Sequence, residues 1–184
     1  VQFNKALSMD KSHTEIYKDI SDVYEKKRDF PKAIEAYKNY LDEMKSSPDI
    51  SDLFLYGRLN YYAATDSAYQ DKQPTYLAEA DTIFAQVAVK VPDNYLGNFW
   101  RARVNSLRDP ETTQGLAKPY YEAALSILEQ KSDATKSVLV ECNSYLGYYY
   151  FVKEDYNQSK QYWNKILEID PENETATKAL GGIK

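Results

Sequence analysis

Apolar and small residues recur along the chain with the spacing of helices that pack in pairs. The segment from Asp29 to Tyr40 has an echo in the segment from Asp155 to Ile166. In both, an acidic–aromatic pair opens the segment, a small residue follows four places after the acid, and an aromatic residue follows four places later. Residues three and four apart share one face of a helix, so each segment predicts an amphipathic helix.

Aromatic residues that correspond to Tyr37 and Trp163 in this pattern recur along the chain. Together they are Phe3, Tyr37, Phe84, Tyr121 and Trp163. Their spacings are 34, 47, 37 and 42 residues. The shortest spacing equals one helix–turn–helix unit of about 34 residues, and the longer ones indicate the same unit with insertions. The pattern therefore predicts a series of stacked helical hairpins.

The same periodicity predicts an all-α chain. No segment shows sustained period-2 alternation, so no sheet is expected. The predicted helices span 1–9, 13–27, 31–46, 50–70, 75–91, 94–107, 115–130, 135–153, 156–168 and 172–181. Pro31 fits the first turn of its helix, where a missing N–H costs nothing, and Pro171 marks a helix boundary.

Two segments near the ends of the chain carry the same longer motif. One reads Leu146-Gly147-x2-Tyr150-x8-Ser159-x3-Trp163-x2-Ile166-x4-Pro171, and the other reads Tyr17-x2-Ile20-Ser21-x2-Tyr24-x8-Ala33-x3-Tyr37-x2-Tyr40. The motif resembles that of the tetratricopeptide repeat (TPR) family, W-x2-L-G-x2-Y…A-x3-F…P. The first segment departs from it at Asn143, where a large aromatic is usual, and at Ser159, where Ala is usual.

The resemblance implies a right-handed α–α superhelix, a TPR-like solenoid of about four hairpins with a half unit at the N-terminus and a C-terminal capping helix. Residues 1–184 would then form a single TPR-like repeat domain. Its expected parts are a half repeat at 1–12, repeats at 13–49, 50–92 (with an insertion), 93–134 (divergent) and 135–171, and the capping helix at 172–184. Because the chain opens in mid-repeat and without Met, we expect it to be a fragment of a longer chain.

Composition narrows the chemistry that the chain can perform. A net charge of −5 argues against binding to nucleic acid or anionic membranes, and no apolar run approaches the roughly 20 residues of a membrane span. With one cysteine, Cys142, and one histidine, His13, a disulfide framework and most metal sites are excluded. Phosphate-binding, hydrolase and EF-hand motifs are missing. The sequence therefore predicts no enzyme activity, no catalytic residue, no metal and no cofactor.

In the TPR family the first helix of each repeat lines a groove, with positions 2, 5, 6, 9, 12 and 13 facing it. Counted onto this chain, these positions include a polar–aromatic set that we expect to bind a peptide: Arg58, Tyr62, Asn98, Arg101, Asn105, Tyr145 and Tyr148. Arg and Tyr are enriched at binding hot spots, and Asn both donates and accepts hydrogen bonds. The alternative is that these tyrosines pack between helices and these arginines pair with local acids.

Some members of the TPR family bind the carboxylate tails of chaperones with a clamp of Lys, Asn and Arg. The resemblance implies the positions at which such a clamp would lie in this chain. Only Lys18, Asn98 and Arg101 fall at compatible places in this chain. Asp22 stands where the clamp would place Asn. This departure counts against a chaperone-tail specificity.

Three functions remain open from the sequence. The first is a non-catalytic scaffold that binds a protein or peptide partner in the groove. The second is a structural subunit of a bacterial cell-envelope assembly that self-associates through its uncapped N-terminal face. The third is a glycan-binding element, motivated by the 18 tyrosines, because sugars stack on exposed aromatic rings. The composition is similar to that of extracytoplasmic repeat proteins of Gram-negative bacteria, although the low cysteine content suits the cytoplasm as well.

Overall fold

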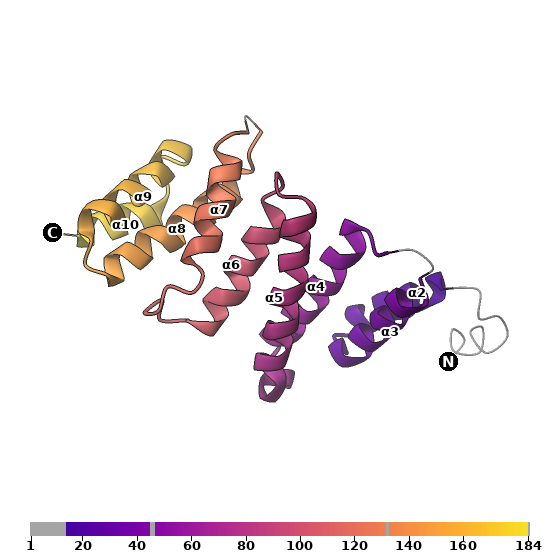
Figure 1. Cartoon of the computed structure of the whole chain (residues 1–184). Coiled ribbons are helices and arrows are strands. Elements are labelled where there is room, and N and C mark those ends of the chain that lie inside the picture. The colour runs from indigo at the N-terminus through magenta and orange to yellow at the C-terminus, as the bar shows by residue number, and fades with distance from the viewer. Residues whose placement is uncertain (1–13, 45–46, 132, 184) are drawn as a thin grey trace. The chain divides into compact units, whose positions relative to one another are not determined.

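The structure, a computed structural model, describes residues 14–44, 47–131 and 133–183, and these residues form helices without any strand. The predicted all-α fold class is confirmed. The chain divides into two compact units, Val1–Lys90 and Val91–Lys184. Their helices run from indigo to magenta and from pink to yellow in Figure 1.

The described part of the first unit contains two helical hairpins. Helix α2 (Glu15–Lys26) packs against α3 (Phe30–Glu43), and α4 (Ile50–Thr65) packs against α5 (Gln73–Lys90). Helix α3 also contacts α4, so the two hairpins lie side by side within the unit. A short 3-10 helix, η1 (Ser67–Lys72), connects α4 to α5 and contacts both.

In the second unit the described residues form five helices, each of which contacts the next. They are α6 (Leu96–Arg108), α7 (Lys118–Leu128), α8 (Lys136–Val152), α9 (Tyr156–Ile169) and α10 (Glu174–Gly182). With one exception in the first unit, the helix ends lie within three residues of those predicted, which is the usual spread of helix boundaries. The helix predicted over 1–9, the half repeat and the proposed self-associating face lie outside the described residues.

The aromatic residues predicted as repeat anchors form the centre of each hairpin. Tyr37, Phe84, Tyr121 and Trp163 are all buried. They come from α3, α5, α7 and α9, the second helix of each hairpin. Phe3, the remaining anchor, lies outside the described residues. In the described part of the chain the predicted anchors therefore take the same buried place on the second helix of successive hairpins.

In two hairpins a glycine of the first helix faces the aromatic anchor of the second helix at close range. A Cβ atom added to Gly147 would lie 2.7 Å from Cε2 of Trp163, and one added to Gly57 would lie 2.8 Å from Cε1 of Phe84. Real Cβ atoms do not come so close to carbon, so these positions require glycine. The buried Ser159 adds a polar contact by donating its hydroxyl to the carbonyl of Gly147 at 2.8 Å.

The first hairpin has a matching hydrogen bond, but here the serine lies on the first helix and the carbonyl on the second. Ser21 on α2 donates its hydroxyl to the carbonyl of Ala33 on α3, also at 2.8 Å. Ser21 and Ala33 are twelve residues apart, as are Gly147 and Ser159. A small residue on each helix is therefore what lets the two backbones meet, and a serine at either place satisfies a carbonyl there.

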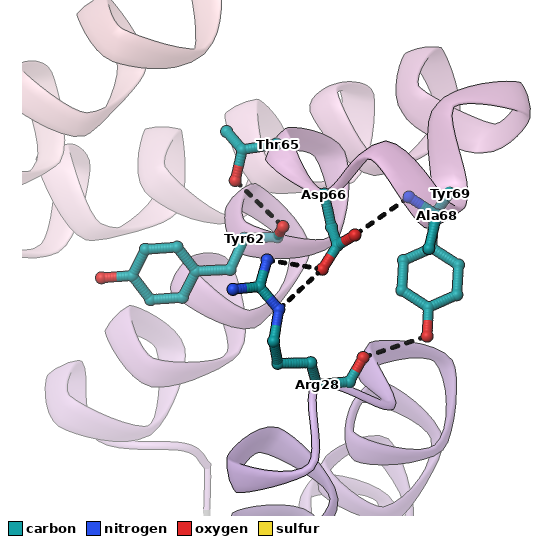
Figure 2. Close-up of polar contacts among 6 residues, drawn as sticks. All are labelled: Arg28, Tyr62, Thr65, Asp66, Ala68 and Tyr69. Carbon is teal, nitrogen blue, oxygen red and sulfur yellow. Dashed lines mark hydrogen bonds and ion pairs between the residues drawn. The ribbon is translucent and has the colours of Figure 1, made fainter.

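The helix predicted over 50–70 is wrong in its last turn, because α4 ends one residue before Asp66. Asp66 is buried in an extended conformation, and its carboxylate accepts the N–H of Ala68 at 2.9 Å. Arg28 donates Nε and Nη2 to the same carboxylate at 3.0 and 2.7 Å, and its carbonyl accepts the hydroxyl of Tyr69 at 3.0 Å (Figure 2). The Ala68 N–H and the Arg28 guanidinium hold the pKa of Asp66 below its usual range. This pairing ends the helix.

The turns after α2 and α8 share a left-handed residue that is not glycine. Arg28 has φ 58° and Glu154 has φ 61°. In each turn the next N–H closes the helix end, from Asp29 to the carbonyl of Tyr24 and from Asp155 to that of Tyr150, at 3.0 and 2.9 Å. Glycine is the usual residue at such a helix end.

Asp109 holds the loop between α6 and α7 together. Its buried carboxylate accepts the N–H groups of Gln114, Gly115 and Leu116 at 3.0, 2.6 and 3.4 Å. Gly115 has φ 73°, and a Cβ atom there would overlap the ring of Tyr149. Burial alone would raise the pKa of Asp109, but the backbone donors outweigh it and hold the pKa below its ordinary value.

The variant Gly147→Ala tests the contact between α8 and α9. Its added methyl group overlaps the indole of Trp163, so we expect the free energy of unfolding to fall by about 1–3 kcal/mol, the usual cost of overpacking. Urea unfolding followed by circular dichroism measures the change. Gly181→Ala is the matched control, because Gly181 lies one 34-residue repeat further on and a Cβ atom there meets nothing within 4 Å. Equal losses in the two variants would show that the indole contact does not require glycine.

Asp109 makes the stability of the second unit sensitive to acid. Because the folded pKa lies below the ordinary value of 3.8, the carboxylate stabilises the folded state above that pH, and the stabilisation is lost as the pH falls through the folded pKa. We expect the unfolding free energy below about pH 4 to fall more steeply in the wild type than in Asp109→Asn. Urea unfolding from neutral to acid pH measures both slopes. Glu111→Gln, an exposed change in the same loop, is the control, and equal slopes for wild type and Asp109→Asn contradict the assignment.

Candidate functional site

Arg58 and Tyr62, the proposed site residues of the first unit, lie one turn apart on α4 and contact each other. Nη2 of Arg58 donates to the hydroxyl of Tyr62 at 3.3 Å, and the guanidinium carbon lies 5.2 Å from the ring centre. Both side chains are half-buried. The ring of Tyr61 lies edge-on to that of Tyr62, with 5.9 Å between the centres. The first unit thus holds an arginine–tyrosine pair fixed by its own helix.

The three proposed residues of α6 differ in the contacts that they make within the protein. Nη2 of Arg101 donates to the hydroxyl of Tyr120 on α7 at 2.9 Å, with the guanidinium carbon 4.1 Å from the ring centre. Asn105 is buried, and its amide donates to the carbonyl of Arg101 at 2.8 Å and accepts from Arg108 at 3.3 Å. Asn98 is half-buried. Arg101 and Asn105 therefore contribute polar contacts within the α6–α7 hairpin.

The two proposed tyrosines of α8 lie in different surroundings. The ring of Tyr145 packs on Tyr121 of α7, with 4.6 Å between the centres, whereas Tyr148 is 43% exposed. One turn further on, Phe151 is 41% exposed, and its ring lies 5.8 Å from that of Tyr156. Tyr148 and Phe151 are thus the large apolar side chains that α8 exposes to another molecule.

An apolar pocket of about 240 Å³ opens beside these two rings, within the second unit. We call it the C-terminal pocket, and its lining residues are Tyr148, Phe151, Trp163, Lys178, Ala179, Gly182 and Ile183. They come from α8, α9 and α10, the orange to yellow helices of Figure 1, and from the residue after α10. Trp163 and Ile183 are buried members of one apolar cluster, so the floor of the pocket is part of the core.

The repeat register explains why these residues meet. Gly182 lies one 34-residue repeat after Tyr148, and in the same count Lys178 and Ala179 fall at positions 5 and 6 of α10. Tyr148 and Phe151 occupy positions 9 and 12 of α8. These five residues therefore stand at places that the TPR pattern assigns to a groove. Sequence reasoning identified Tyr148 but missed the pocket, because the pocket depends on where α10 packs.

A buried carboxylate connects the two hairpins of the first unit, a contact that no sequence pattern indicated. Asp52 on α4 accepts the hydroxyls of Tyr37 and Tyr40 on α3 at 3.3 and 3.2 Å. It also accepts Nζ of Lys18 on α2 at 3.1 Å. Burial alone would lower the pKa of Lys18, but its bond to Asp52 outweighs this effect and raises the pKa. Lys18, which stands at a clamp position of the family, is thus paired inside the unit.

Glu141 on α8 has the same arrangement in the second unit. Arg103 on α6 donates Nε and Nη2 to its two oxygens at 2.7 and 2.6 Å, and Tyr121 on α7 donates its hydroxyl at 3.2 Å. Burial, together with the charge of Glu141, raises the pKa of Tyr121 above its ordinary value. In both units a carboxylate on one hairpin therefore accepts hydrogen bonds from both helices of the preceding hairpin.

The described residues contain little that favours reaction chemistry. Burial raises the pKa of the Cys142 thiol to about 12, so the thiol stays protonated at neutral pH. In the part of the chain that the structure describes, no group of three or more His, Cys, Asp or Glu side chains could hold a metal ion. His13 lies outside that part. The described helices include none with the length and hydropathy that crossing a bilayer requires.

No protein-family model and no curated protein matches the chain, whereas several solved structures do. The fold is similar to the C-terminal part of a TPR repeat-containing protein from Cytophaga hutchinsonii, with 31% identity and a TM-score of 0.82 over 97% of this chain and 64% of that one. The chain thus spans less than two thirds of that structure.

Two further solved structures are similar at lower identity, which concerns the fold alone. A MamA RS-1 double mutant has 18% identity and a TM-score of 0.66, over 92% of this chain and 82% of that one. A thermophilic TPR protein of Thermus thermophilus has 15% identity and a TM-score of 0.58, over 98% and 86%. Together with the two sequence motifs and the buried anchors, the likeness to the Cytophaga hutchinsonii protein supports the tetratricopeptide repeat family, and the two structures of lower identity support its fold.

Proposed function

We propose that this chain is a non-catalytic scaffold that binds a protein or peptide partner through the groove positions of its first helices. Its TPR fold supports a role in protein–protein interaction. The observation that carries the proposal is the pair of exposed rings, Tyr148 and Phe151, at the edge of an apolar pocket. Exposed aromatic rings beside a pocket are typical of binding hot spots, because they remove much apolar area from water on contact.

The remaining site residues have supporting roles in this proposal. Arg58 and Tyr62 in the first unit, and Arg101 with Tyr120 in the second, are pairs already held in one geometry. A partner that meets such a pair loses less side-chain entropy than one that meets free side chains. Asn98 offers an amide for backbone hydrogen bonds. Asn105 and Tyr145 would act by holding these surfaces in place.

The other two hypotheses gain less support. A sugar-binding platform requires exposed rings that are coplanar, whereas the exposed rings of Phe151 and Tyr156 are inclined by 51°. The cell-envelope hypothesis relied on the N-terminal face, which lies outside the described residues. The scaffold is therefore the function that the described geometry favours.

The double variant Tyr148→Ser with Phe151→Ser tests the scaffold. With the full chain immobilised as bait, we expect the proteins captured by the wild type to decrease at least about tenfold, because loss of hot-spot rings costs 1–2 kcal/mol or more in binding. Quantitative mass spectrometry of the captured proteins is the measurement.

Two further baits complete this experiment. Val89→Ser, at a residue 80% exposed in the first unit, is the control and is expected to retain all partners. Arg58→Ala combined with Arg101→Ala examines the supporting pairs and is expected to weaken capture less than the ring variant. Identical capture by all four baits would rule out the groove positions as the binding surface.

A further inference from the structure

We infer that the C-terminal pocket receives one large apolar side chain, such as Phe, Leu or Met, from a partner polypeptide that carries a carboxylate next to it. The inference rests on the proposed scaffold function and specifies the chemistry of the partner. Three properties of the pocket support it: its size and lining, the side chain that is missing from α10, and the single charge at its edge.

The size and lining of the pocket fit a side chain better than a free small molecule. At about 240 Å³ it is smaller than the 300–1,000 Å³ of typical small-molecule sites. The surface that faces the pocket is apolar, so it has no donors or acceptors to orient a polar metabolite. Trp163 and Ile183 form its floor, and the exposed rings of Tyr148 and Phe151 stand beside it. Such a site recognises apolar volume, with favourable contacts to aromatic edges and faces.

The lining of the pocket includes Gly182, which stands on α10 at the position that Tyr148 fills on α8. One repeat after Tyr148 the chain has Gly182, and a Cβ atom added there would meet nothing within 4 Å. The glycine is therefore not required by close packing, unlike Gly147. The space that it leaves beside the rings of α8 is what an incoming side chain would occupy.

Among the described residues that line this pocket, Lys178 is the charged one. Its ammonium group pairs with Glu174 at 3.1 Å, but the two side chains are 78% and 84% exposed. Such a pair contributes little to stability, because water and salt screen it. The lysine can therefore turn to a partner's carboxylate at small cost, and this positive charge favours an acidic residue beside the inserted side chain.

The test uses synthetic peptides of about ten residues, made of Gly and Ser with one Phe followed by two Glu. Matched peptides carry Ala in place of Phe, or Lys in place of Glu. The chain has two tryptophans, and only Trp163 lines the pocket, so its indole N–H signal in a ¹H–¹⁵N NMR spectrum reports binding while that of Trp100 is the internal control. We expect saturable shifts of the Trp163 signal with the Phe–Glu peptide and none with the Ala peptide.

Two glycine variants show whether the pocket itself is occupied. Gly182→Leu fills it and is expected to weaken binding of the Phe–Glu peptide at least about tenfold. Gly181→Leu is the matched control, since Gly181 is exposed, does not line the pocket and has nothing within 4 Å of an added Cβ atom. Thermal unfolding of both variants confirms that they fold. Equal binding by Gly182→Leu and the wild type overturns the inference.

Charge reversal at Lys178 tests the carboxylate. Lys178→Glu is expected to weaken the Phe–Glu peptide by about three- to tenfold and to strengthen the Phe–Lys peptide by a similar factor, because complementary charges select partners. No response of Trp163 to any peptide, or an equal response to the Ala peptide, also overturns the inference. If capture of proteins still depends on Tyr148 and Phe151 in that case, the scaffold stands and only the partner chemistry is wrong.

Discussion

Two of the described hairpins depend on a glycine of the first helix that lets the aromatic anchor of the second helix approach the backbone. Gly147 against Trp163 and Gly57 against Phe84 show the contact in its tightest form. A helical hairpin of this length cannot bury both of its apolar faces alone, so each one relies on its neighbour in a repeat array. The ring fixes the distance between the two helices, and that distance decides which faces remain for the neighbour.

Packing of side chains sets how the paired helices lie, and carboxylates then connect one hairpin to the next by hydrogen bonds. Asp52 loses water on burial and Glu141 is half-buried, and each accepts hydrogen bonds from one cation and from at least one tyrosine hydroxyl. Phenylalanine would pack in the places of Tyr37 and Tyr121, but it could not donate to a carboxylate. These contacts give a structural reason for some of the 18 tyrosines, which suggested sugar binding when composition alone was considered.

The part of the fold that depends on local spacing was predictable from sequence, and the part that depends on distant partners was not. The anchors at Tyr37 and Trp163 follow from positions three and four apart on one helix. The break at Asp66 does not, because its partner Arg28 is 38 residues away. Arg28 and Glu154 likewise adopt left-handed conformations without the glycine that would have indicated them.

The same distinction applies to the candidate site. Tyr148 was recognisable from the sequence because its place in the repeat faces the groove. In the structure its side chain stays 43% exposed. Arg101 and Asn105 also occupy groove positions of the repeat, yet both make hydrogen bonds within the α6–α7 hairpin. A repeat position thus indicates which way a residue faces, but only packing shows whether its polar groups are already used.

In the proposed scaffold, the C-terminal pocket gains its specificity at a position without a side chain, Gly182. Glycine in a helix costs about 1 kcal/mol relative to alanine, and less near a helix end that frays. Gly182 is the last residue of α10, so leaving the pocket open destabilises the fold little. The rings of Tyr148 and Phe151 meanwhile stay exposed, which is unfavourable in water but becomes favourable when an apolar group covers them. A gap of this kind beside two exposed rings is therefore a surface whose free energy improves on binding, whereas filling the gap with a side chain of the protein itself would remove that gain.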